Sequence, residues 1–279
     1  MEPFESAWLK WGQAVIDTHV LRDNVLEMSS QPDLKMPSTY TTYYDVKRHC
    51  IPLLIVEVEN PFPPSWGLLL GEIVHNYRCA LDHIAWDLYR RGRLPKPLSE
   101  RQEQNIGFPI CSKRKTFNDS LGQKLPGVER TDRAIVRRFQ PYIPGESRAH
   151  LHVFTVLRDL SNADKHRSIQ PVVGVPDKVA FDDLRPSDCS LTRITMGRGF
   201  TGTLEPGAEL AQFYVKKDGP NPHIDVQPRF SLTPAIHERL TLIDFLRQTM
   251  SATAIVLRQF SDPPPSLLNL VGPLMPAQT

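Results

Sequence analysis

The sequence predicts an α+β fold, in which a helical bundle of about four long helices carries a small antiparallel β-sheet or meander. Two observations support this prediction. Several segments repeat apolar residues at helical spacing, whereas two other regions are rich in β-branched and aromatic residues and are broken by Gly, Pro and Asp. The 279 residues are enough to bury a sizeable core without disulfide support.

The predicted helices are placed by their apolar spacing and by their capping residues. Trp8, Val15 and Leu21 return to one helical face in the first segment. Ser65 is the expected N-cap of the second long helix, and Thr233 with Pro234 opens the last one. The predicted helices cover residues 5–28, 66–92, 115–123, 129–139, 149–167 and 233–260.

The predicted strands lie in two regions. Residues 40–60, "YTTYYDVKRHCIPLLIVEVEN", read as a hairpin or as paired strands, and "IGFPI" near residue 108 reads as a short strand. Short segments between Gly, Pro and Asp predict an antiparallel meander further along. We therefore expect a mainly helical core over 1–167 with the hairpin near 40–60, a β meander over 168–232, a helix over 233–260 that returns to the bundle, and a Pro-rich tail over 261–279.

Composition restricts the partners. Lys and Arg (33) nearly balance Asp and Glu (31), so no global field favours nucleic acid or membrane, and such a partner would need a local patch. The four scattered cysteines fit reduced thiols, and the longest apolar stretch, "IPLLIVEV", is too short to span a bilayer. We expect a soluble cytoplasmic protein with no membrane partner.

The stretch "HNYRCALDH", residues 75–83, carries the candidate site. On a helical wheel an apolar stripe faces the core, and a second face carries His75, Asn76, Asp82 and His83, with Arg78 at its border. Arg78 and Asp82 are spaced for an i,i+4 ion pair. Cys79 and Trp86 project among these charges, which predicts that another element or a second chain covers this face.

A second cluster, "LRDLSNADKHRS", ends the third long helix. Asp164 follows Leu157 and Leu160 towards the interior, and His166 lies two residues further on. An inward carboxylate needs a cationic or donor partner, so Arg78 or a histidine of the preceding long helix is the expected partner of Asp164. A purely structural role for Asp164 is the more frequent alternative.

Two resemblances rest on these residues. "RCALDH", Arg78 to His83, resembles the R-x4-6-H motif of HEPN domains, helical modules of bacterial toxins and antiphage proteins that cut RNA without a metal. More broadly, "GEIVHNYRCALDHIAWDL", then "FPI", then "LSNADKHR", is similar to a group of bacterial proteins without an established function, over roughly residues 55–168.

The HEPN resemblance implies a metal-independent ribonuclease of toxicity or defence, without cofactor, that acts as a homodimer. Arg78 would stabilise the phosphate in the transition state and His83 would move a proton, with Asn76 and Asp82 as nearby polar groups and with support from His75, Asp164 and His166. For RNA binding, residues 112–138 hold eight Lys or Arg against three Asp or Glu, and Arg130, Arg133 and Arg137 recur on one helical face. An ordinary solvated face explains the same three arginines.

Two other function classes remain open from the sequence. A metal-dependent hydrolase would use His75, Asp82, His83, Asp164 and His166, although His75 and His83 are spaced eight residues apart rather than three or four. A non-catalytic interaction module would use the Arg, Asp and His cluster to lock the helices, and the β region to bind a partner protein. Nucleotide-phosphate loops, nucleophile elbows and dinucleotide fingerprints are absent from the sequence.

Overall fold

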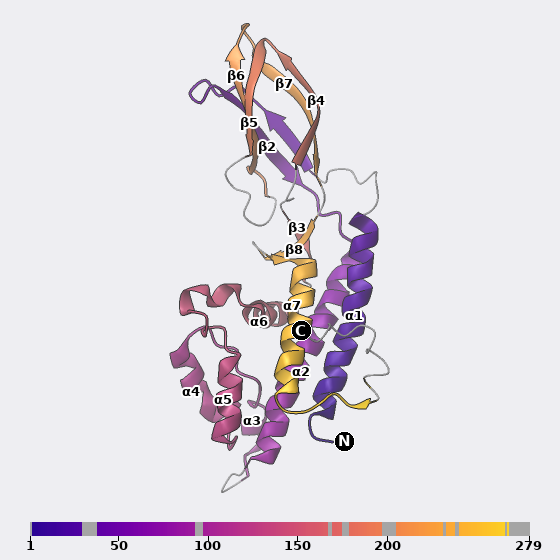
Figure 1. Cartoon of the computed structure of the whole chain (residues 1–279), viewed down its shortest axis with the longest axis vertical. Helices are drawn as coiled ribbons and strands as arrows, with labels where there is room; N and C mark the ends of the chain where they lie inside the picture. Colours follow the sequence, from indigo (N-terminus) through magenta and orange to yellow (C-terminus); the bar gives the residue numbers. More distant parts are fainter. Residues whose placement is uncertain are drawn as a thin grey trace. The chain divides into compact units, whose positions relative to one another are not determined.

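The computed structural model describes residues 2–29, 38–92, 97–166, 169–174, 179–196, 205–230, 233–237, 240–265 and 267. The chain divides into two compact units, each built from separated segments. The helical unit comprises Met1–Asp23, Pro64–Gln170 and Asp244–Thr279, and the β unit comprises Asn24–Pro63 and Pro171–Ile243. The predicted α+β class with antiparallel sheets is confirmed, but there are more helices than about four and several sheets instead of one (Figure 1).

Three long helices form the centre of the helical unit: α1 (Glu5–Ser29), α2 (Pro64–Arg91) and α7 (Leu242–Arg258). The Trp11 indole N–H donates to the Met250 carbonyl oxygen at 3.0 Å, which joins α1 to α7. The buried hydroxyls of Thr18 and Tyr77, 3.1 Å apart, join α1 to α2. The polar groups of Trp11, Thr18 and Tyr77 are therefore satisfied inside the core.

Shorter elements complete this unit (Figure 1). They are α3 (Glu100–Glu103), α4 (Arg114–Lys124), α5 (Arg130–Arg138), the 3-10 helix η1 (Glu146–Leu151) and α6 (Val153–Asp164), which packs against α2. The two short helices predicted before residue 140 are confirmed. The predicted helix over 149–167 is divided, because His152 adopts an extended conformation and caps α6.

Two other helix starts differ from the prediction. α2 begins at Pro64, whose fixed φ suits the first helical position, so Ser65 lies inside the helix and does not cap it. α7 begins at Leu242, because Thr233 and Pro234 belong to a strand, β8 (Thr233–His237), that pairs with β3 (Val172–Gly174). Pairing with a segment about sixty residues earlier thus overrides the local helix-start signal.

The β unit is antiparallel throughout the described residues. One sheet has the order β1 (Ser38–Thr42), β2 (Cys50–Val58), β6 (Glu209–Lys217), β5 (Cys189–Met196). A second has β4 (Val179–Ser187) paired with β7 (His223–Phe230), and a third has the order β3, β8, β9 (Leu240–Thr241). The predicted hairpin over 40–60 is confirmed by the β1–β2 pair. Within 168–232, β5 pairs with β6 as in a meander, but β4 pairs with β7 in a separate sheet, and β6 also pairs with β2, so these strands do not form the single predicted meander.

Three further predictions concern the "IGFPI" segment, the cysteines and membrane-spanning helices. "IGFPI" forms neither strand nor helix. The four cysteines are free thiols. Within the described part of the chain, no helix has the length and apolar character needed to cross a membrane. Most of the Pro-rich tail, residues 266 and 268–279, lies outside the described residues.

Candidate functional site

The two faces of α2 separate as its sequence spacing predicts. Ile73, Tyr77, Leu81 and Ile84 are fully buried, and the neighbouring positions of the stripe are buried with them. Arg78, Asp82 and His83 are partly exposed, and His75 is exposed. The helical period of the apolar residues thus fixes which side chains of α2 border the candidate site.

Arg78 and Asp82 form the predicted ion pair, and the pair binds a third group. The Arg78 Nε donates to Asp82 Oδ2 at 2.9 Å, and its Nη2 donates to Asp82 Oδ1 at 2.6 Å. The same Nη2 donates to the carbonyl oxygen of Phe108 at 2.9 Å, while the Phe108 N–H donates to Asp82 Oδ1 at 2.8 Å. We call this arrangement the Phe108 clasp, because the ion pair satisfies both backbone groups of Phe108.

The rest of the "FPI" segment is held in the same way. Gln140, which is 1% exposed, donates to the Pro109 carbonyl oxygen at 2.8 Å and accepts from the Cys111 N–H at 3.1 Å. Arg158 of α6 donates to the Ile110 carbonyl oxygen at 3.2 Å. A buried segment outside any sheet needs such partners for its backbone. This explains why "IGFPI" is not a strand: side chains from distant parts of the helical unit bind its backbone in place of a neighbouring strand.

The remaining residues of the predicted catalytic group do not converge on Arg78. Asn76 is 6% exposed, and its Oδ1 accepts from Lys10 of α1 at 3.1 Å, so it belongs to the contact between two helices. His75 lies 3.3 Å from the Cys79 sulfur through its Nε2. His83 is half-buried, and its Nδ1 is buried without a hydrogen-bond partner. Burial raises the pKa of the Cys79 thiol, which keeps it protonated and a poor nucleophile.

Neither of the predicted partners of Asp164, Arg78 or a histidine of α2, forms a hydrogen bond or ion pair with it among the described residues, and Arg78 binds Asp82 and Phe108. Asp164 lies instead against Gly71 of α2, where a Cβ atom would be 2.7 Å from its Oδ1. His166 is exposed in the turn after α6. Trp86 keeps 38% of its surface exposed and packs on Tyr89, with ring centroids 5.4 Å apart. No part of the described chain therefore covers Trp86 completely, and the homodimer stays a prediction.

Among the described residues, no three His, Cys, Asp or Glu side chains are grouped so that they could hold a metal ion.

The three predicted RNA-binding arginines are close together. Arg130, Arg133 and Arg137 of α5 line one hollow of about 480 Å³ beside α4. We call it the arginine hollow.

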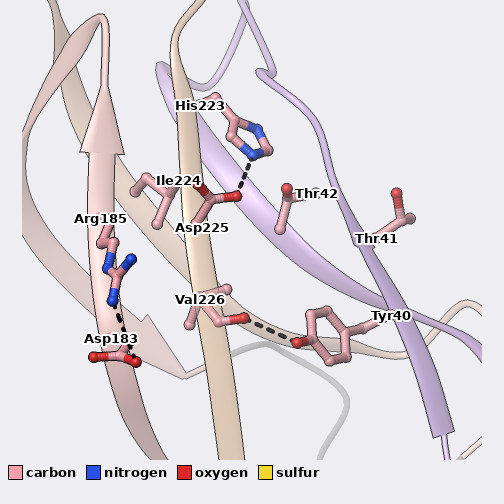
Figure 2. A pocket seen from close by; sticks show the side chains of 9 residues that line it. All are labelled: Tyr40, Thr41, Thr42, Asp183, Arg185, His223, Ile224, Asp225 and Val226. Atoms are coloured by element: carbon pink, nitrogen blue, oxygen red, sulfur yellow. Dashed lines mark hydrogen bonds and ion pairs between the residues drawn. The ribbon is translucent and has the colours of Figure 1, made fainter.

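The β unit contains a cavity of about 540 Å³, bordered by β1, β4 and β7 and shown in Figure 2. The Tyr40 hydroxyl donates to the Val226 carbonyl oxygen at 3.0 Å, so a side chain of β1 is joined to the backbone of β7. His223 Nε2 lies 3.0 Å from Asp225 Oδ1, and Arg185 lies 3.5 Å from Asp183. We call this space the β1–β7 cavity.

Sequence reasoning missed both the β1–β7 cavity and two residues that hold "FPI". A signal for the cavity is present in "HIDV", because residues two apart in a strand lie on the same face, which brings His223 beside Asp225. No local signal identifies Gln140 or Arg158, since their partners are backbone groups about thirty and fifty residues away.

Comparison of the chain with family models, with curated proteins and with solved structures found no match. The helical unit and the β unit therefore have to be interpreted from their own geometry. The HEPN resemblance and the ribonuclease role that it implies stay predictions.

Proposed function

We propose that this protein is a non-catalytic interaction module that binds an extended peptide segment of a partner in the β1–β7 cavity. The observation that carries the proposal is a cavity of about 540 Å³ beside an edge strand. Cavities of a few hundred cubic ångströms are typical of sites that enclose a ligand or a side chain.

The edge strand β1 supplies the backbone groups for such a partner. Its inner side pairs with β2, and its outer side pairs with no other described strand. A bulge between Thr39 and Tyr40 twists the first part of the strand, while Tyr40 to Thr42 keep a regular register. An extended peptide that pairs with this part of β1 gains main-chain hydrogen bonds, which give affinity, and one of its side chains enters the cavity, which gives specificity.

The cavity wall is polar. Asp225 and His223 form one pair and Asp183 and Arg185 form another, and all four side chains are at least half exposed. Thr41 and Thr42 add hydroxyl groups from β1. Exposed polar pairs of this kind contribute little to stability, so their place around a cavity fits recognition of a polar side chain better than structural support.

The Phe108 clasp supports the same interpretation for the helical unit. The Nε and Nη2 groups of Arg78 already donate hydrogen bonds to Asp82 and to Phe108. The positive charge of Arg78 is therefore compensated in the absence of a substrate. A phosphate-binding arginine in a nuclease has to present its forked donors to the substrate. The cluster that resembles an active site in the sequence thus serves to fix an irregular segment between helices.

The test is selection of peptides from a displayed random library on the wild-type protein, followed by fluorescence-polarisation titration of the enriched peptides. Thr42→Arg, which introduces a long side chain at the cavity, should weaken binding at least tenfold, and Asp225→Ala should weaken it for peptides with a basic side chain. Lys216→Ala, an exposed position on β6 away from the cavity, is the control. Failure to enrich any peptide, or equal affinity for Thr42→Arg, would contradict the proposal.

We keep the metal-independent ribonuclease as a second candidate, because two donor positions are left open. Arg78 Nη1 makes no hydrogen bond within the described chain, and the buried Nδ1 of His83 has no partner. A phosphate contacted by Nη1 would be consistent with the clasp. The measurement is cleavage of end-labelled total RNA and tRNA in excess EDTA, beside a folded His83→Ala variant. Cleavage by wild type alone favours the ribonuclease; cleavage by neither favours the interaction module.

A further inference from the structure

Three arginines of α5 face the same hollow in the helical unit. Arg130, Arg133 and Arg137 are spaced i, i+3 and i+7, so they lie along one side of the helix. Opposite them, Leu121 of α4 and the turn at Gly127 and Val128 complete the wall. Gly127 has a positive φ of 65°, a conformation that suits glycine.

These arginines lack the carboxylate partners that several other arginines of the unit have. Arg78 pairs with Asp82, Arg91 with Asp132, and Arg158 with Asp159. No ion pair is formed by the three arginines of the hollow with any described residue. Like charges at these spacings repel each other on a helix, and an anion in the hollow would remove this repulsion.

Arg133 has a buried N–H group for which no acceptor is present among the described residues. Its Nη2 donates to the Leu125 carbonyl oxygen at 3.1 Å, whereas its Nε is buried without a hydrogen-bond partner. Arg137 is only lightly held, with its guanidinium 5.7 Å from the centre of the Phe117 ring and a long contact of 3.3 Å to Asn118. A small change of the Arg133 rotamer towards a bound anion would give the guanidinium the acceptor that it lacks.

The start of α5 adds positive potential at the same place. Its N-cap residue, Glu129, makes no side-chain hydrogen bond to the helix, and Asp132 in the first turn is bound to Arg91. Glu129 also lines the hollow. Three guanidinium groups against one carboxylate leave two positive charges around the space, which matches the charge of a phosphate monoester near neutral pH.

We propose that the arginine hollow binds the phosphate monoester of a nucleotide-sized ligand. Guanidinium forks match the oxygens of phosphate two at a time, and the doubly charged phosphate monoester matches the two positive charges of the hollow better than a singly charged carboxylate does. The volume of about 480 Å³ leaves room for more than the phosphate, and Leu121, Val128 and Ala134 give an apolar wall for a base. The hollow is independent of the peptide proposed for the β1–β7 cavity, because all its residues belong to the helical unit.

The phosphate monoester can come from a free mononucleotide or from the 5′ end of an RNA strand, and the test separates the two. Isothermal titration calorimetry on the full chain uses AMP, a 5′-phosphorylated RNA tetranucleotide and the same tetranucleotide with a 5′-hydroxyl. The variants are Arg133→Gln and the double variant Arg130→Gln with Arg137→Gln. Arg138→Gln is the matched control, since Arg138 is an exposed arginine of the same helix that does not line the hollow.

We expect AMP and the 5′-phosphorylated tetranucleotide to bind, and the 5′-hydroxyl tetranucleotide to bind at least tenfold more weakly. Arg133→Gln and the double variant should each lower the affinity for the phosphorylated probes tenfold or more. Arg138→Gln should change this affinity less than twofold. Equal affinity for AMP and the 5′-phosphorylated strand identifies a free nucleotide as the source, and tighter binding of the strand identifies an RNA end. Absence of binding by both phosphorylated probes, equal binding of the 5′-hydroxyl strand, or full binding by Arg133→Gln would overturn the proposal. Circular dichroism of each variant verifies that it is folded.

Discussion

Asp82 and Phe108, 26 residues apart in the chain, are joined by a hydrogen bond of 2.8 Å from the Phe108 N–H to Asp82 Oδ1. The same carboxylate accepts a hydrogen bond from Arg78 Nη2, and this Nη2 also donates to the Phe108 carbonyl oxygen. One side-chain pair on α2 therefore satisfies both polar backbone groups of a residue whose side chain is 1% exposed. Without this pair, the N–H and C=O of Phe108 would be left in the core without partners.

Asp82→Ala should lower the free energy of unfolding by about 2 kcal/mol, because it leaves a buried N–H unsatisfied and removes the ion-pair partner of Arg78. Asp82→Asn retains an oxygen acceptor for Phe108 and should cost less. Urea unfolding at pH 7 measures both. Asp119→Ala is the control, since Asp119 forms an exposed i,i+4 pair with Lys115 and should change stability by less than about 0.5 kcal/mol. Equal losses for Asp82→Ala and Asp119→Ala would show that the clasp is not structural.

Gly107→Ala should also destabilise the helical unit, through contact with the clasp. A Cβ atom at Gly107 would lie 2.9 Å from Asp82 Oδ1 and 3.7 Å from Arg78 Nη2, so the carboxylate would have to move away from Phe108. We expect a loss of about 1–3 kcal/mol, typical of overpacking.

Gly122→Ala provides the matched comparison for Gly107→Ala. A Cβ at Gly122 in α4 would meet no atom within 4 Å, and alanine favours the helix by about 0.5–1 kcal/mol over glycine. Thermal unfolding of the two variants should therefore give shifts of opposite sign. A rise in Tm for Gly107→Ala would mean that the clasp has free space beside it.

Local periodicity predicted the part of the site that depends on one helix. The buried stripe of α2 and the Arg78–Asp82 pair both follow from the 3.6-residue repeat. The partners of that pair did not follow, because Phe108 is reached across a loop of irregular backbone. For the same reason Thr233 and Pro234 signal a helix start locally but lie in β8, whose strand partner is distant in sequence. Contacts between segments far apart in the chain decided each of these differences.

The three motifs of the broader resemblance meet in the structure. "FPI" binds the Arg78–Asp82 pair of the "GEIVHNYRCALDH" helix, and Asp164 of "LSNADKHR" lies against Gly71 of the same helix. Residues that are separated in the sequence thus form neighbouring contacts on α2. Packing therefore explains why the three segments lie together in this chain, without requiring that they share a catalytic step.

Gly71 and Asp164 should be energetically coupled. A Cβ at Gly71 would lie 2.7 Å from Asp164 Oδ1, so Gly71→Ala forces the carboxylate to swing away. In an Asp164→Ala background the obstacle is gone, and the same substitution should stabilise α2 by up to about 1 kcal/mol through helix propensity. A double-mutant cycle measured by urea unfolding should give a coupling energy of about 1 kcal/mol or more. Additive effects would mean that Asp164 makes no restraining contact with α2.

Acid should weaken the start of α6 through His152. The Nδ1 of His152 accepts a hydrogen bond from the Phe154 N–H at 3.2 Å, which caps the helix, and burial lowers the pKa of this imidazole from its usual 6.5. Below pH 6.5 the unfolded chain binds a proton that the folded chain resists, so this contribution to stability is complete above that pH and is lost as the pH falls. A protonated Nδ1 also loses its lone pair and no longer accepts from Phe154.

His152→Asn should therefore reduce the acid sensitivity while keeping a cap, because asparagine also accepts at the N-cap but does not titrate. The measurement is the urea midpoint at pH 7.5 and pH 5.5 for wild type, for His152→Asn and for His150→Asn. His150 is exposed in η1 two residues earlier, so its replacement should leave the wild-type fall of the midpoint almost unchanged. If His152→Asn loses as much stability as wild type between the two pH values, other groups control the acid response, and the His152 cap of α6 is not the acid-sensitive group.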